Sequence, residues 1–297
     1  MLPRLGWNAV VKNNPSCEVL LGNCLDFIRE GHVKNVDLTF FDPPYNQGKD
    51  YSYFDDSQDP EKYWSWIQEV VSEIHHVTTQ GGALYLMHRE KNTERLLKVL
   101  RESGWNYQNL IIWRKMTSAV PSNMRYGKQY QVIAFVTKGE RPRVFNRLRI
   151  EPPLPPNYKY QRKSGMYLTD IWEDIRELTS GYFAGDEAVR DKEGNRVHKQ
   201  QTPVALLLRI ILTSSMPKDT VFDPMAGTGT TAVVANQLKR RPIVVEIDPE
   251  YVELIESRLE TLRPSDDIVQ YLIDYGHTPN LESIAGMHID ATQQKLE

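Results

Sequence analysis

The chain of 297 residues has only two cysteines, no long apolar run and no recognisable metal-ligand spacing. Cys17 and Cys24 are too few for a disulfide framework and have no CxxC or Cys/His pattern around them, so we expect neither a disulfide-stapled protein nor a metal site. The best apolar stretch, residues 204–212, is interrupted by Arg209 and is too short to cross a bilayer. The first residues lack the apolar core and cleavage site of a secretory signal. We therefore expect a cytoplasmic protein that has no membrane partner.

The composition is that of a soluble globular protein. Hydrophobic residues make up 40% of the chain and charged residues 25%, with ordinary levels of Gly and Pro, which argues against collagenous, disordered and coiled-coil classes. At roughly 100 to 200 residues per domain, the length allows one large domain with an inserted module, or two smaller domains.

Positive charge is concentrated in one segment, although the net charge of the chain is −3. Residues 114–163 contain twelve basic and two acidic side chains, which makes this segment +10 and the rest of the chain −13. Aromatic residues lie between the basic ones, as suits phosphate contact and base stacking, whereas the plain alternative is a solvated surface or a dimer contact. We predict that the segment binds nucleic acid. The candidate contacts are Arg125, Lys128, Arg141, Arg143, Arg147, Arg149, Lys159, Arg162 and Lys163.

Apolar β-branched runs alternate with stretches of helical periodicity over most of the chain, which predicts βαβ units and a mostly parallel sheet with helices on both faces. Strands are expected at 18–21, 36–41, 83–87, 110–113, 131–136, 220–222 and 243–246, with a polar loop over 46–60. The pattern breaks down over 138–201, which is Pro-rich and irregular. We therefore predict a catalytic domain formed by residues 1–137 and 202–262, an inserted recognition module over 138–201, and a tail over 263–297 to which no role is assigned.

A glycine-rich turn follows the predicted strand 220–222 and opens a helix. The next strand ends in Glu246, nineteen residues after Gly227. Glycines let backbone amides approach a ligand closely, and an acid at the tip of the second strand can accept both ribose hydroxyls, so a nucleoside cofactor is expected. No Lys follows the glycines, which argues against a nucleotide-hydrolysing P-loop. Both a dinucleotide and S-adenosylmethionine fit this unit.

The sequence Asp42-Pro43-Pro44-Tyr45-Asn46 ends another buried strand, at the edge where open α/β sheets bind ligands. It could simply be a proline turn. It also suits an attack by the amino group of a nucleobase, which is a poor nucleophile. The Asp42 carboxylate and the Pro43 carbonyl can each accept one N–H and stabilise the positive charge that develops on the nitrogen. The prolines fix the backbone, and the Tyr45 ring offers a face on which an extruded base can stack.

These motifs, together with HxxQ at 198–201 and VVEIDPEYVELIESRL, resemble those of the amino-group DNA methyltransferases that use S-adenosylmethionine. The order, with DPPY before the glycine-rich turn, resembles their β class. The resemblance covers residues 18–262 and implies a Rossmann-like seven-stranded sheet with a reversed final hairpin. It implies a catalytic element formed by Asp42, Pro43, Pro44 and Tyr45. It implies a cofactor site formed by Asn23, Cys24, Leu25, Gln201, Thr202, Asp223, Pro224, Met225, Ala226, Gly227, Gly229, Thr230, Thr231 and Glu246.

The chain departs from the family pattern at three places. Asn23 stands where Asp is common, which keeps an acceptor but loses a charge. Met225 and Ala226 stand where Phe with Cys or Ala is usual. Thr202 replaces a frequent Lys, which puts in doubt a salt bridge from that position to the cofactor carboxylate.

The resemblance implies transfer of a methyl group to N6 of adenine in double-stranded DNA, with extrusion of the base. DPPY favours adenine in this family, and N4 of cytosine or an RNA base are the alternatives. An NAD-dependent oxidoreductase and a DNA-binding module without catalysis are the competing readings of other classes. The chain has no Pro-Cys dipeptide, so the thiolate chemistry of cytosine C5 methylation is not expected. The sequence leaves open a homodimer and a cognate restriction endonuclease as partners.

Overall fold

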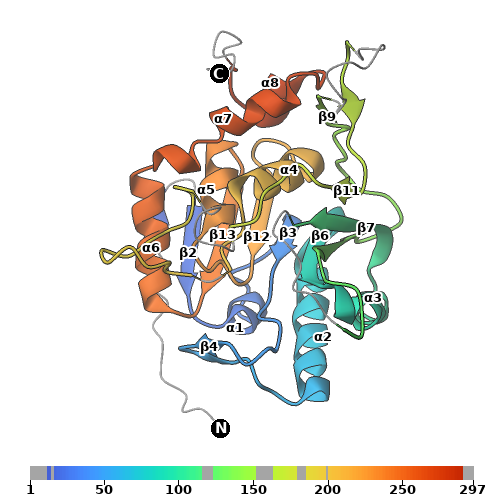
Figure 1. Ribbon diagram of the computed structural model, residues 1–297, viewed down its shortest axis with the longest axis vertical. Helices are drawn as coiled ribbons and strands as arrows, with labels where there is room; N and C mark the ends of the chain where they lie inside the picture. The colour runs from blue at the N-terminus through green and yellow to red at the C-terminus, as the bar shows by residue number, and fades with distance from the viewer. Residues whose placement is uncertain are drawn as a thin grey trace.

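The computed structural model describes residues 12–14, 17–115, 123–151, 163–178, 185–198 and 200–289, and its centre is a nine-stranded sheet (Figure 1). The strands lie in the order β1 (Lys12–Asn14), β2 (Cys17–Leu21), β13 (Arg241–Glu246), β12 (Thr220–Asp223), β3 (Val36–Phe41), β6 (Thr78–Arg89), β8 (Tyr130–Thr137), β7 (Asn106–Arg114) and β11 (Ile171–Trp172). From β2 to β6 all neighbours are parallel, and β8 runs antiparallel between β6 and β7. The mostly parallel sheet with a reversed strand is thus confirmed. It has nine strands instead of seven because the short strands β1 and β11 extend its two edges.

Helices cover both faces of the sheet because buried side chains alternate along the strands. In β6, Leu84 and Leu86 pack with α1, α2 and α3, whereas Tyr85 and Met87 pack toward α4. The first layer contains α1 (Cys24–Arg29), α2 (Pro60–Val77) and α3 (Thr93–Glu102), and the second contains α4 (Val204–Ser214), α5 (Thr230–Gln237) and α6 (Pro249–Glu260). No helix in the described part of the chain has both the length and the apolar character needed to cross a bilayer.

Two helix starts are set by the same local signal, an Asp followed by Pro. Asp59 accepts hydrogen bonds from the backbone amides of Glu61 and Lys62 at the start of α2, and Asp248 accepts one from Glu250 at the start of α6. The proline in the first position has no N–H to leave unsatisfied. These two boundaries therefore follow directly from the sequence.

The chain beyond α6 belongs to the folded core. It forms 3-10 turns at Pro264–Asp266 and Ile273–Tyr275 and the short helices α7 (Val269–Leu272) and α8 (Leu281–Ala285). Their apolar side chains pack in the same cluster as α4, which is why α4 is buried on nearly all sides. The sequence shows little periodicity here because none of these pieces completes two helical turns.

The described parts of residues 138–201, predicted as an inserted module, are distributed over both ends of the sheet. The hairpin formed by β9 (Arg149–Ile150) and β10 (Met166–Tyr167) lies near α7 and α8 at the top of Figure 1, opposite α1 and β4. The chain then returns beside β7 as β11 and reaches the carboxyl ends of the parallel strands. The predicted polar loop 46–60 contains a second hairpin, β4 (Asp50–Tyr51) and β5 (Phe54–Asp55).

Candidate active site

A cavity of about 240 Å³ opens at the carboxyl ends of β2, β13, β12 and β3. Most of the residues predicted for catalysis and cofactor binding line it together. They are Asn23, Cys24, Asp42, Pro43, Pro44, Gln201, Thr202, Asp223, Pro224, Met225, Ala226, Gly227, Thr230, Thr231 and Glu246. Three others, Leu25, Gly229 and Tyr45, are outside the lining that the described residues form. The tertiary structure thus brings two motifs almost two hundred residues apart to one site.

The glycine-rich turn between β12 and α5 needs its two glycines for different reasons. Gly227 and Gly229 have φ angles of +53° and +80°, which side chains with a Cβ rarely adopt. A Cβ on Gly227 would face the His198 ring at 3.7 Å, so this glycine is next to the cavity. A Cβ on Gly229 would lie 2.5 Å from a side-chain carbon of Ile255. Gly229 therefore allows α5 and α6 to pack closely and does not itself face the cavity.

Two acids hold the turn in place. Asp223 accepts hydrogen bonds from the Met225 amide at 3.0 Å and from the Thr231 hydroxyl. Glu246 accepts from the Gly227 amide at 2.7 Å through one carboxylate oxygen, and from the Ile247 and Asp248 amides through the other. An ionised carboxylate has about four acceptor positions, so Glu246 can still accept a hydrogen bond from a ligand.

Asn23 is the residue immediately before α1. Its side-chain oxygen accepts from the Leu25 amide at 3.0 Å, which makes Asn23 the N-cap of the helix. Asn is as good a cap as Asp, so this departure from the family pattern keeps the local structure. Leu25 itself points into the core, where it is 6% exposed.

Asp42 follows β3 and is held from two sides. One carboxylate oxygen accepts from the Tyr45 hydroxyl, and the other accepts from the Thr202 hydroxyl at 3.4 Å. The Gln131 amide in turn donates to the Tyr45 oxygen at 2.9 Å. Thr202, which replaces the usual Lys, therefore contacts the acid of the DPPY element.

The Tyr45 ring is buried beside the cavity. The residue is 3% exposed, and its ring lies against His88 with 4.9 Å between centroids. The hydrogen bonds of its hydroxyl to Asp42 and Gln131 hold it there. Stacking of a base on Tyr45 stays a prediction. Among the aromatic residues that do line the cavity, Tyr53, Phe54 and Trp66 come from the β4–β5 hairpin and α2, and the sequence motifs did not identify these three as site residues.

A buried histidine supports the same turn. The Nδ1 atom of His88 accepts a hydrogen bond from the Arg89 backbone amide. The proton of the neutral ring is therefore on Nε2, which donates a hydrogen bond to the Tyr63 hydroxyl oxygen at 2.9 Å. Tyr63 then donates to the Pro44 carbonyl at 2.6 Å. Burial lowers the pKa of His88 to about 3, which keeps the ring neutral and this chain of bonds intact. No motif pointed to His88 or Tyr63.

Four acidic residues line the cavity: Asp42, Asp223, Glu246 and Asp248. Burial raises the pKa of Asp42, of Asp223 and of Glu246 to about 7 in each case. Charging all three in a site of low polarity is costly unless a cation is present. Burial in this site therefore disfavours the ionised forms of these three carboxyls.

Gln201 contributes more to the fold than was predicted. Its side-chain oxygen accepts from the Val189 amide at 2.8 Å, and its amide group donates to the Glu187 carbonyl at 2.9 Å. Gln201 is 7% exposed. Gln201 thus lines the cavity and also holds residues 187–189 in place through these two hydrogen bonds.

The predicted DNA contacts separate into two groups. Arg143 is ion-paired with Asp37, near the start of β3, and with Asp219, just before β12. Arg143 therefore lies at the amino ends of the parallel strands. Asp42 lies five residues further along β3, roughly 16 Å away at the rise of a strand. Lys159 and Arg162 are outside the described residues. Lys163 adjoins the β9–β10 hairpin at the same amino end, together with Arg141, Arg147 and Arg149.

Arg125 and Lys128 belong to the other end. Their loop leaves β7 at Arg114 and returns at Tyr130, and the next residue, Gln131, contacts Tyr45. Arg125 is exposed, and Lys128 is ion-paired with Glu90 just after β6. Of the predicted contacts that the structure describes, these two lie on the side of the cavity.

Comparison with known proteins gives a consistent result. The model of the N6/N4 methyltransferase family, described as DNA methylase, matches residues 36–257. The DNA adenine methyltransferase YhdJ of Escherichia coli K12 is 29% identical over 274 residues, which cover 86% of this chain and 87% of that protein. The Type II methyltransferase M.HinfI of Haemophilus influenzae is 25% identical over 270 residues, covering 86% and 71% respectively.

Solved structures share the fold. The cytosine-N4-specific PvuII DNA methyltransferase superposes with a TM-score of 0.62 at 18% identity, covering 90% of this chain and 93% of that one. The M1.HpyAVI–SAM complex superposes with a TM-score of 0.56 at 22% identity, covering 82% and 100%.

Proposed function

Because the chain belongs to the N6/N4 DNA methylase family and is an amino-group DNA methyltransferase, we propose that it methylates N6 of adenine in duplex DNA. The observation that carries the proposal is the common cavity of the DPPY turn and the glycine-rich turn, with Asp42 on its wall. The adenine specificity named for YhdJ favours adenine over cytosine N4.

The site fits S-adenosylmethionine as the cofactor. Its sulfonium is a cation, which offsets the cost of charging the buried carboxyls of Asp223 and Glu246, and it supplies a methyl group bonded to positive sulfur. Glu246 would accept a ribose hydroxyl through its remaining acceptor position, Asn23 and Cys24 would lie at the adenine ring, and the turn from Asp223 to Thr231 would hold the methionine part.

Asp42 and the Pro43 carbonyl would accept the two N–H groups of the target amine and stabilise its developing positive charge. Tyr63 already donates to the neighbouring Pro44 carbonyl, which fixes the direction of the turn. Both acceptors line a cavity that a base stacked in a duplex cannot enter, so we expect the adenine to be extruded from the helix.

Mass spectrometry of nucleosides tests the reaction directly. Duplex DNA is incubated with the protein and labelled S-adenosylmethionine and then digested to nucleosides. It should yield labelled N6-methyl-2′-deoxyadenosine. Labelled N4-methylcytosine would support the alternative base, and a failure to label any nucleoside would contradict the proposal.

The rate of methyl transfer should depend on pH through Asp42. An acid with its pKa raised to about 7 in the folded protein is mostly neutral below that pH and charged above it. Only the charged form fully stabilises the cationic amine, so kcat/KM should rise about tenfold per pH unit below 7 and level off above it. A profile that is flat from pH 5.5 to 9 would show that ionisation of Asp42 does not limit the reaction.

We expect DNA to lie across the carboxyl end of the sheet. Replacing Arg125 and Lys128 by neutral residues should therefore weaken duplex binding more than replacing basic residues at the amino end of the sheet. Arg125→Gln with Lys128→Gln should lower the slope of log K against log salt by up to about 1.8, since each phosphate contact contributes about 0.9. Arg141→Gln with Arg147→Gln is the control of equal charge, and it should leave the slope unchanged. A larger change in the control would place the DNA at the other end.

A further inference from the structure

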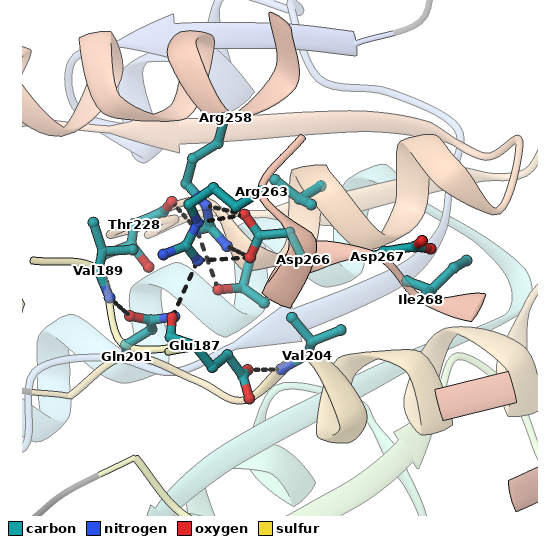
Figure 2. Close-up of polar contacts among 12 residues, drawn as sticks. Glu187, Val189, Gln201, Val204, Thr228, Arg258, Arg263, Asp266, Asp267 and Ile268 are labelled. Atoms are coloured by element: carbon teal, nitrogen blue, oxygen red, sulfur yellow. Dashed lines mark hydrogen bonds and ion pairs between the residues drawn. The ribbon is translucent and has the colours of Figure 1, made fainter. Parts of the chain in front are cut away.

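A buried ionic cluster joins the chain after α6 to the walls of the cavity (Figure 2). Its centre is Asp266, which is 0% exposed. The Asp266 carboxylate accepts from Arg258 Nε at 3.1 Å and Nη2 at 2.8 Å, and from Arg263 Nε at 2.7 Å and Nη2 at 2.6 Å. Two bidentate arginine pairs on one carboxylate fix both guanidinium groups in position.

Arg258 reaches the glycine-rich turn from this cluster. Its Nη1 donates to the Thr228 carbonyl and lies 3.4 Å from the Thr230 hydroxyl. Thr228 is between the two glycines with positive φ and lines the cavity. Because glycines leave the turn few conformational restraints of its own, a fixed partner for the Thr228 carbonyl restricts where its amides point.

Arg263 reaches a second group of lining residues indirectly, through Glu187. Its Nη2 donates to the Glu187 carbonyl at 3.1 Å, which also accepts from Gln201 at 2.9 Å. The Glu187 side chain accepts from the Val204 amide at 2.6 Å, at the start of α4 (Figure 2). The segment fastened in this way continues to Thr202, which contacts Asp42.

We infer that Asp266 is a positioning residue for cofactor binding, and that Asp266, Arg258 and Arg263 together act as a clamp on two parts of the cavity lining. Through Arg258 it sets the glycine-rich turn, and through Arg263 it sets the segment from Glu187 to Thr202. The inference rests on the proposed function, because it takes S-adenosylmethionine as the ligand whose affinity the clamp controls. The alternative is that the cluster serves folding alone.

A second buried arginine provides the matched control. Arg209 in α4 is 2% exposed and forms a bidentate pair with Asp174 and a hydrogen bond to Tyr275. None of these three residues lines the cavity as the structure describes it. Asp174→Asn and Asp266→Asn therefore each take the carboxylate from a buried arginine, and both should lower the unfolding temperature.

Titration calorimetry with S-adenosylmethionine separates the two roles. Asp266→Asn should raise Kd about tenfold, within the range reported for residues that couple to a site without touching the ligand, and kcat at saturating cofactor should change less. Asp174→Asn should leave Kd unchanged. Equal Kd values for Asp266→Asn and wild type would overturn the clamp.

A milder variant keeps the test decisive if Asp266→Asn does not fold. The Arg263 side chain is 26% exposed, so Arg263→Gln should fold, and it removes the link to Glu187. We expect Kd to rise about threefold, again on the scale of such coupling, and an unchanged Kd would overturn the role of the second group of lining residues. A wild-type protein that binds no S-adenosylmethionine would overturn the proposed function and the clamp together, whereas binding without DNA methylation would overturn only the proposed function.

Discussion

Asp42→Ala should lower the rate of methyl transfer at least a hundredfold, the scale of removing one preorganised electrostatic group, while affinity for S-adenosylmethionine stays close to that of the wild type. Asp42 is held by Tyr45 and Thr202, so its carboxylate needs little reorganisation during the reaction. The groups proposed for the cofactor, Glu246 and the glycine-rich turn, remain in the variant. Single-turnover measurements with saturating cofactor and DNA isolate the chemical step.

Asp42→Asn is the control for shape. It keeps a hydrogen-bond acceptor and the volume of the side chain but loses the negative charge. If charge is what counts, this variant should also lose most of the activity. Near-normal turnover by purified Asp42→Ala would remove Asp42 from the catalytic role.

Glu246→Ala should weaken binding of S-adenosylmethionine by about ten- to a hundredfold. A hydrogen bond to a charged group contributes about 1.5 to 3 kcal/mol, and the remaining acceptor position of Glu246 allows one such bond to the ribose. The variant also loses the acceptor of the Gly227 amide, which helps to hold the glycine-rich turn. Calorimetric titration measures the change.

Glu250→Ala is the matching control because Glu250 lies four residues further on, at the exposed start of α6. Its affinity for the cofactor should equal that of the wild type. The assignment of Glu246 would fail if both variants bound equally well, and tight binding of NAD with none of S-adenosylmethionine would contradict the cofactor itself.

Local sequence accounts for much of the fold and for the outline of the site. Strand β3 ends where Asp42 begins the DPPY turn, and β12 ends at Asp223, as the apolar runs and their punctuation indicate. Asp-Pro pairs set the starts of α2 and α6. The carboxyl ends of parallel strands meet at one edge of a sheet, so the two motifs could be expected to share one cavity.

The sequence motifs do not determine the direction in which their side chains point. The sequence identifies Tyr45, but whether its ring faces the cavity depends on Gln131 and His88, which come from strands far along the chain. Both polar groups of the Gln201 side chain likewise form hydrogen bonds with the backbone of Glu187 and Val189. A motif specifies which groups are present, whereas long-range hydrogen bonds decide where they point.

The sequence by itself determined the class of sheet, the two turns and the chemistry that their residues can perform, because these depend on local periodicity and on residue type. Only the tertiary structure decided which end of the sheet the described basic residues occupy and where the chain after α6 packs. Arg143 and Arg125 are both parts of one positive segment, yet the antiparallel course of β8 carries them to opposite ends of the sheet. Asp266 lies in a segment without periodicity, and no motif indicates that Arg258 and Arg263 both contact its carboxylate.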